Sequence, residues 1–319
     1  MTKSFHTLLA TLLLLLGMSV HAGEIPSWAL NPPADDARWL WGVGEGQNIG
    51  LAKRNALKDI AAKLQVTISG QIENEINVTN GVVNKKARSK VAEVVQKTVF
   101  RNYLVEKTDH SGGNYLLLLK VDRKAFTAET KATLGNLDNS LQQALSRLDN
   151  NTPLNQYIIL QRLQPDLDKA ADTAQILIGA EPGGEGLNYL RKYSKLQNQI
   201  SHAAEDLVFR IQASPADQDI AAIINTYLNE AKIRTSKTAG NVLSISSNSR
   251  ADRIGADNYV RLNIVLSIQD AQGQSLASRN YTVTGNSVYD SNGARQSALQ
   301  TFLQALREVG FEKGMGFVN

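Results

Sequence analysis

Three glycines stand at alternating positions in the stretch Trp39-Leu-Trp-Gly-Val-Gly-Glu-Gly-Gln-Asn48, directly before an amphipathic run. Gly42, Gly44 and Gly46 carry no side chains, so the backbone there can turn tightly or approach another segment closely. The apolar residues before them predict a short strand, and the three- and four-residue spacing after them predicts a helix over residues 49–64. We therefore predict that these glycines form a structural turn between strand and helix.

An alternative is that the glycine stretch holds an anion or a peptide carboxylate at the N-terminus of the helix. A dinucleotide site needs G-x-G-x-x-G in a parallel β-α-β unit, and a phosphate loop needs Gly-Lys-Ser/Thr. The spacing here is G-x-G-x-G without that lysine, and Glu45 within it would repel an anion. The pattern favours structural glycines and predicts no cofactor.

The N-terminus has the pattern of a secretory signal peptide. Lys3 precedes an apolar run over residues 8–20, and Val20-His21-Ala22 is typical of a cleavage site. The run is short for a membrane-spanning helix, which needs about 20 apolar residues. We expect residues 1–22 to be a cleaved signal peptide, and the mature chain to be periplasmic with no integral membrane span. A peripheral association with the outer membrane stays open.

Composition excludes several classes of site. The chain has no cysteine, which excludes disulfides, zinc–thiolate sites, cysteine nucleophiles and a lipid-bearing N-terminal cysteine. A net charge of +4 without a dense basic patch gives no indication of nucleic-acid binding. His110 and His202 are the only histidines after residue 22, and we expect His110 in a hairpin turn and His202 on a helix. We predict no catalytic residues and no metal site.

The distribution of apolar residues predicts an α+β protein. We expect a small α+β domain over residues 23–126, a helical hairpin or arm over 127–206, and a second domain of order β-α-β-β-β-α over 207–319. Apolar residues at even positions from 66 to 78 predict a strand in the first domain, with Gly70 marking a bulge or bend. The alternative for the middle segment is that its helices pack within one larger domain.

Trp28, Trp39 and Trp41 are the only tryptophans, and all lie in or near the proline-rich lead-in. They either clamp this segment onto the first domain or form an exposed patch that binds a partner, because tryptophan is favoured in binding hot spots. The sequence leaves both open.

These residues also carry a family resemblance. Ile25-Pro-Ser-Trp28, Pro32-Pro33 and Trp41-Gly-Val-Gly-Glu-Gly46, followed by helix positions that include Ala52 and Asp59-Ile60-Ala61, resemble the LPP-twenty lipoprotein family over roughly residues 26–126. The resemblance implies a small α+β envelope domain with no known enzymatic activity. Relatives include outer-membrane lipoproteins and assembly or stability factors of the flagellar basal body. The lipid-bearing cysteine of such lipoproteins is absent here.

Together these patterns predict a non-enzymatic periplasmic protein of the cell envelope that docks to an outer-membrane-associated complex. Its expected partners are other envelope proteins, and its oligomeric state stays open. The alternatives are a module that binds peptidoglycan or a small ligand, and an envelope hydrolase.

Overall fold

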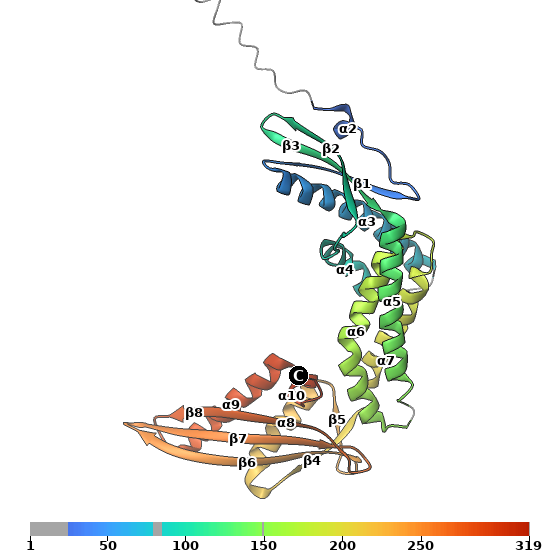
Figure 1. Ribbon diagram of the computed structural model, residues 1–319. Helices are drawn as coiled ribbons and strands as arrows, with labels where there is room; N and C mark the ends of the chain where they lie inside the picture. The colour runs from blue at the N-terminus through green and yellow to red at the C-terminus, as the bar shows by residue number, and fades with distance from the viewer. Residues whose placement is uncertain (1–24, 79–84, 149, 319) are drawn as a thin grey trace, which may run out of the picture. The chain divides into compact units, whose positions relative to one another are not determined.

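The computed structural model describes residues 25–78, 85–148 and 150–318, so the expected signal peptide lies outside the described residues (Figure 1). The chain forms two compact units. Unit 1 contains the described residues up to Thr133 together with Asp172–Asn188, and unit 2 contains Leu134–Ala171 and the described residues from Tyr189 onward. The predicted domain boundaries near residues 126 and 206 stay predictions.

Unit 1 is built on a three-stranded antiparallel sheet of order β1-β3-β2. Its central strand is a continuous apolar run in which Leu116 to Leu119 are all buried. Two consecutive glycines with positive φ, Gly112 and Gly113, connect β2 to β3. The elements are α2 (Ser27–Leu30), β1 (Trp39–Gly46), α3 (Ile49–Val78), α4 (Lys85–Gln96), β2 (Tyr103–Ser111) and β3 (Asn114–Asp122).

The prediction of a strand over residues 66–78 is wrong, because α3 continues through these residues without a break. Val66 is 74% exposed, and Gly70 lies on the open side of the helix instead of forming a bulge. The apolar stripe repeats every four residues, so it falls on even positions only and imitates the two-residue period of a strand. The buried stripe consists of Ala52, Ala56, Ile60, Leu64, Ile68 and Ile72.

The expected helical hairpin contains three long helices, which contribute residues to both units. The second of them ends at the turn-forming sequence Glu181-Pro-Gly-Gly. No helix in the described part of the chain has both the length and the apolar character to span a membrane. The three are α5 (Arg123–Leu145), α6 (Pro153–Ala180) and α7 (Gly186–Ala203).

Unit 2 contains the predicted order β-α-β-β-β-α, with a two-residue strand and a short last helix added. Its sheet has the order β5-β4-β6-β7-β8, in which β4 runs parallel to β5 and β6 and the other pairs are antiparallel. Even-numbered residues of β7 from Val260 to Ile268 are buried, and Phe302 and Leu306 of α9 belong to the same core. The elements are β4 (Val208–Ala213), α8 (Gln218–Glu230), β5 (Arg234–Thr235), β6 (Asn241–Ile254), β7 (Asp257–Gln269), β8 (Ser275–Ser287), α9 (Ser291–Val309) and α10 (Phe311–Gly314).

Candidate functional site

The three glycines lie inside β1, so the predicted turn is wrong. They alternate along the strand and are all buried toward α3. A Cβ on Gly44 would lie 2.1 Å from the carbonyl oxygen of Ala52 and 2.2 Å from the backbone nitrogen of Ala56. The absence of side chains therefore lets the strand rest directly on the backbone of the helix.

The same geometry explains why these glycines do not form a phosphate-binding loop. They stand opposite Leu119, Leu117 and Tyr115 of β3 in the sheet register. Backbone groups of alternate residues point to alternate sides of an antiparallel strand. The glycine N–H groups consequently face β3, and only the odd-numbered residues of β1 direct backbone groups to the outer edge.

Part of this outer edge is closed by the lead-in. The backbone N–H of Trp41 donates to Asp35 Oδ1 at 2.7 Å, and that of Trp39 donates to Asp36 Oδ1 at 2.7 Å. The carbonyl oxygen of Trp39 accepts a hydrogen bond from the backbone N–H of Asp36 at 3.0 Å. The backbone N–H groups of Arg38 and Trp39 also lower the pKa of Asp36 by stabilising its carboxylate.

Side chains of α3 hydrogen-bond to further backbone groups on this outer edge of β1. The N–H of Val43 donates to Asp59 Oδ2 at 3.1 Å, and Lys63 Nζ donates to the carbonyl oxygen of Trp41 at 2.8 Å. Asn55 Nδ2 donates to the carbonyl oxygen of Glu45 at 2.7 Å. Lys63 and Asp59 also form an ion pair at 2.9 Å. An edge strand with its backbone groups bonded in this way cannot easily accept another strand.

Sequence reasoning missed these three capping residues. Asn55, Asp59 and Lys63 are four residues apart, so they form a row on the helix beside the buried row that contains Ala52 and Ala56. A polar row next to a row of small residues was a detectable signal. This polar row can be interpreted as capping only if β1 packs closely on α3. The sequence pattern predicts a turn at the glycines instead, so it does not bring the strand to the helix.

The opposite edge of the sheet, β2, is open in the described part of the chain. Leu104 is 56% exposed and Val105 is 46% exposed. Since β3 directs the backbone of its even-numbered residues toward β2, the register turns the backbone groups of Tyr103, Val105 and Thr108 outward. The hydrogen bond from Asp122 N to Asn102 O, at 3.2 Å, agrees with this assignment.

The tryptophans gather on the face of the sheet opposite α3. Lys120 Nζ lies 4.7 Å from the ring centroid of Trp39 and 5.5 Å from that of Trp41. Trp41 also lines a pocket with Trp28 of α2 and Pro33 of the lead-in. Trp28 therefore lies with the lead-in against the sheet, as a clamp would, while partner binding by the tryptophans stays a prediction.

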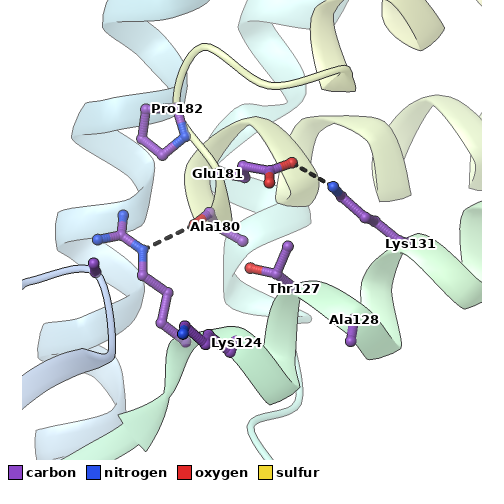
Figure 2. Close-up of a pocket in the computed structure, with 9 residues that line it drawn as sticks. Lys124, Thr127, Ala128, Lys131, Ala180, Glu181 and Pro182 are labelled. Carbon is purple, nitrogen blue, oxygen red and sulfur yellow. Dashed lines mark hydrogen bonds and ion pairs between the residues drawn. The ribbon is translucent and has the colours of Figure 1, made fainter.

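A second hollow of unit 1, with a volume of about 540 Å³, is lined mainly by α5 and by the loop after α6. In Figure 2, Thr127 projects from α5 toward this loop, and a dashed line joins Lys131 to Glu181. That ion pair is 2.7 Å long, and its hydrogen bond raises the pKa of Lys131. Arg123 is also engaged, since its Nε donates to the carbonyl oxygen of Ala180 at 2.9 Å. These two bonds therefore connect α5 to the loop after α6. They also engage Arg123 and Lys131, two of the three cationic side chains that line the hollow.

The two histidines lie in different units. His110 belongs to β2, not to the hairpin turn as predicted, and its ring meets the ring of Tyr115 edge-on at 4.7 Å. His202 lies on α7 as predicted, with Nδ1 at 3.6 Å from Glu205. Among the described residues, no three histidine or acidic side chains are grouped so as to hold a metal ion.

Comparison with known proteins identifies the N-terminal part of the chain. Residues 26–122 match the LPP20 lipoprotein family, and no curated protein matches the chain. A minor lipoprotein from Acinetobacter baumannii shares 16% identity over 31% of this chain and 85% of its own, with a TM-score of 0.28. The secreted protein HP1454 from Helicobacter pylori shares 16% identity over 85% of this chain and 99% of its own, with a TM-score of 0.42. Lipoprotein GNA1162 from Neisseria meningitidis shares 11% identity over 33% and 97%, with a TM-score of 0.26.

The family match begins next to Trp28, spans the glycine strand and α3, and ends at the last residue of β3. It therefore contains the bonded outer edge of β1 (the sealed edge), the open edge of β2, and the face of the sheet on which the tryptophans lie. Residues 26–122 therefore match the LPP20 lipoprotein family, and the rest of the chain lies outside the matched region.

Proposed function

We propose that the chain is a non-enzymatic, periplasmic protein of the cell envelope that docks onto a protein partner through the open edge of β2. The match of residues 26–122 to a lipoprotein family supports the envelope location. The partner would belong to an outer-membrane-associated assembly, and the family resemblance makes the flagellar basal body one candidate.

The difference between the two sheet edges carries the proposal. Side chains bond the outward backbone groups of β1 at Trp39 and Trp41, so a partner strand finds few free groups there. No described residue hydrogen-bonds to the outward backbone groups of Tyr103 and Val105 on β2. Strand addition to an exposed edge supplies affinity through main-chain hydrogen bonds and selectivity through side chains. The free edge therefore supports docking at β2.

The side chains of β2 suit a selective interface. Its first half exposes the apolar Leu104 and Val105, which would bury apolar surface against a partner strand. Its second half carries Glu106, Lys107 and Asp109, with a register shift between Val105 and Lys107. Charges and a bulge discourage unselective strand pairing. A partner would thus need apolar residues against the first half and matching charges against the second.

Photo-crosslinking in cells that produce the full chain tests this proposal. A photoreactive amino acid at Leu104 is expected to give one defined adduct with an envelope protein, whereas the same probe at the exposed helix position Val66 gives none. Val105→Pro removes one outward N–H, so we expect it to reduce the Leu104 adduct at least about tenfold, which corresponds to about 1.4 kcal/mol.

Two controls accompany this measurement. Val66→Lys should leave the Leu104 adduct unchanged, and the tryptophan fluorescence of the Val105→Pro protein should show that unit 1 is folded. The same adduct from Val66, or full retention of the Leu104 adduct in folded Val105→Pro protein, would exclude docking at β2.

A further inference from the structure

The tryptophan pocket shares Glu106 and Lys107 with the docking edge described above, but its two indoles have no role in that proposal. Its volume is about 500 Å³, which is within the usual range for small-molecule sites of about 300–1,000 Å³. Its two indoles come from α2 and β1, and Leu118 of β3, which is 1% exposed, is its most deeply buried member. The lining residues are Ser27, Trp28, Asn31, Pro33, Trp41, Glu106, Lys107 and Leu118.

The indole of Trp41 is held in place from the side of Lys120. The ammonium group of Lys120 lies within cation–π distance of both Trp39 and Trp41, and its side chain is 17% exposed. Glu106 forms an ion pair with the same ammonium group at 2.6 Å. A ring fixed in this way loses little conformational entropy when a ligand stacks on it, which favours binding.

Apart from Glu106, the polar side chains that line the pocket make no hydrogen bond to a described residue. The indole N–H groups of Trp28 and Trp41 have no hydrogen-bond partner there, although a half-buried indole N–H usually finds one. The side chains of Ser27, Asn31 and Lys107 likewise make no hydrogen bond to a described residue. The pocket thus combines two flat apolar rings with several unused donors and acceptors.

We infer that this pocket binds the pyranose rings of a glycan. The C–H faces of a pyranose ring are apolar and can stack on an indole, while its hydroxyl or acetamido groups project sideways toward polar partners. Trp28 and Trp41 supply the stacking surfaces, and Asn31 and Lys107 supply hydrogen bonds at the rim. Since Glu106 is already paired with Lys120, the pocket suits an uncharged ring better than a cation.

A proline-rich peptide is the competing ligand, because such peptides dock in grooves lined by aromatic residues. In this pocket the chain's own Pro33 already lines the wall beside Trp28. Because the wall already contains a proline of this chain, we expect a compact ring to fit the pocket better than a second proline-rich segment.

Titration of the purified full-length chain tests the inference. The probes are chitotetraose, cellotetraose and a polyproline peptide, followed by tryptophan fluorescence and by calorimetry. We expect saturable binding of an oligosaccharide, with the better of the two showing whether the acetamido groups contribute. Trp28→Ala and Trp41→Ala should weaken this binding at least about tenfold, in line with the cost of removing an aromatic contact.

Rim variants keep the test independent of folding. Asn31→Ala and Lys107→Ala alter exposed side chains, so we expect them to weaken glycan binding several-fold and to leave unfolding unchanged. Tyr289→Ala, an exposed aromatic residue of unit 2, should have no effect on binding. The inference fails if neither oligosaccharide binds, if binding is unchanged in the tryptophan and rim variants, or if only the polyproline peptide binds. Since no protein partner is present, failure here is distinguishable from failure of docking at β2.

Discussion

Gly44→Ala is expected to destabilise unit 1 by about 3 kcal/mol or more, at or above the upper end of the usual cost of overpacking. The added Cβ would lie within 2.2 Å of backbone atoms of both Ala52 and Ala56, and backbone atoms of a helix cannot move aside as a flexible side chain can. The measurement is urea unfolding followed by tryptophan fluorescence. All three tryptophans belong to unit 1, so this signal reports on that unit alone.

Gly70→Ala provides a matched control, since it makes the same chemical change on the exposed side of α3. No atom outside the helix lies within 4 Å of a Cβ built there. We expect this variant to stabilise unit 1 by about 0.5–1 kcal/mol, because alanine is a better helix former than glycine. Equal effects of the two substitutions would contradict the close packing of β1 on α3.

Phe317→Ala should cost unit 2 about 3–5 kcal/mol, the usual range for removing a buried phenylalanine. Phe317 is fully buried and meets the rings of Tyr157 and Phe311 edge-on, at 6.0 Å and 5.5 Å. Its carbonyl oxygen accepts a hydrogen bond from Arg162 Nε at 2.9 Å, which fixes the end of the described chain against α6. Thermal unfolding followed by far-UV circular dichroism measures the loss.

The control for this variant is Val288→Ala, because Val288 is 63% exposed in the same unit. We expect a change of less than about 0.5 kcal/mol, as for most surface substitutions. A loss below about 1 kcal/mol for Phe317→Ala would show that the C-terminal segment does not stabilise unit 2.

The sequence predicted unit 2 better than unit 1, and periodicity explains why. Val260 to Ile268 alternate strictly in a strand with one buried face, so their pattern has one interpretation. In α3 the spacing of four allows a second interpretation, so the pattern of residues 66–78 predicts a strand where the chain forms a helix. The predicted α+β class is correct despite this error, because the other strands and helices have patterns of their own.

The candidate site was only partly predictable. The glycines and tryptophans were recognised, and the resemblance to a lipoprotein family is confirmed over residues 26–122. The sealed edge of β1 was not predicted, because it depends on hydrogen bonds such as that from Val43 to Asp59, which are sixteen residues apart. Such bonds follow from the packing of a strand on a helix, which local sequence patterns do not specify.

Amide hydrogen exchange of the isolated chain, resolved by residue, tests most directly whether β1 is closed and β2 is open. The N–H groups of Trp41, Val43, Val105 and Thr108 all point away from the sheet, but only the first two donate to carboxylates. Hydrogen bonds to charged groups contribute about 1.5–3 kcal/mol, so Trp41 and Val43 should exchange at least about tenfold more slowly. Equal rates at the two edges, or slower exchange at Val105 and Thr108, would contradict the account.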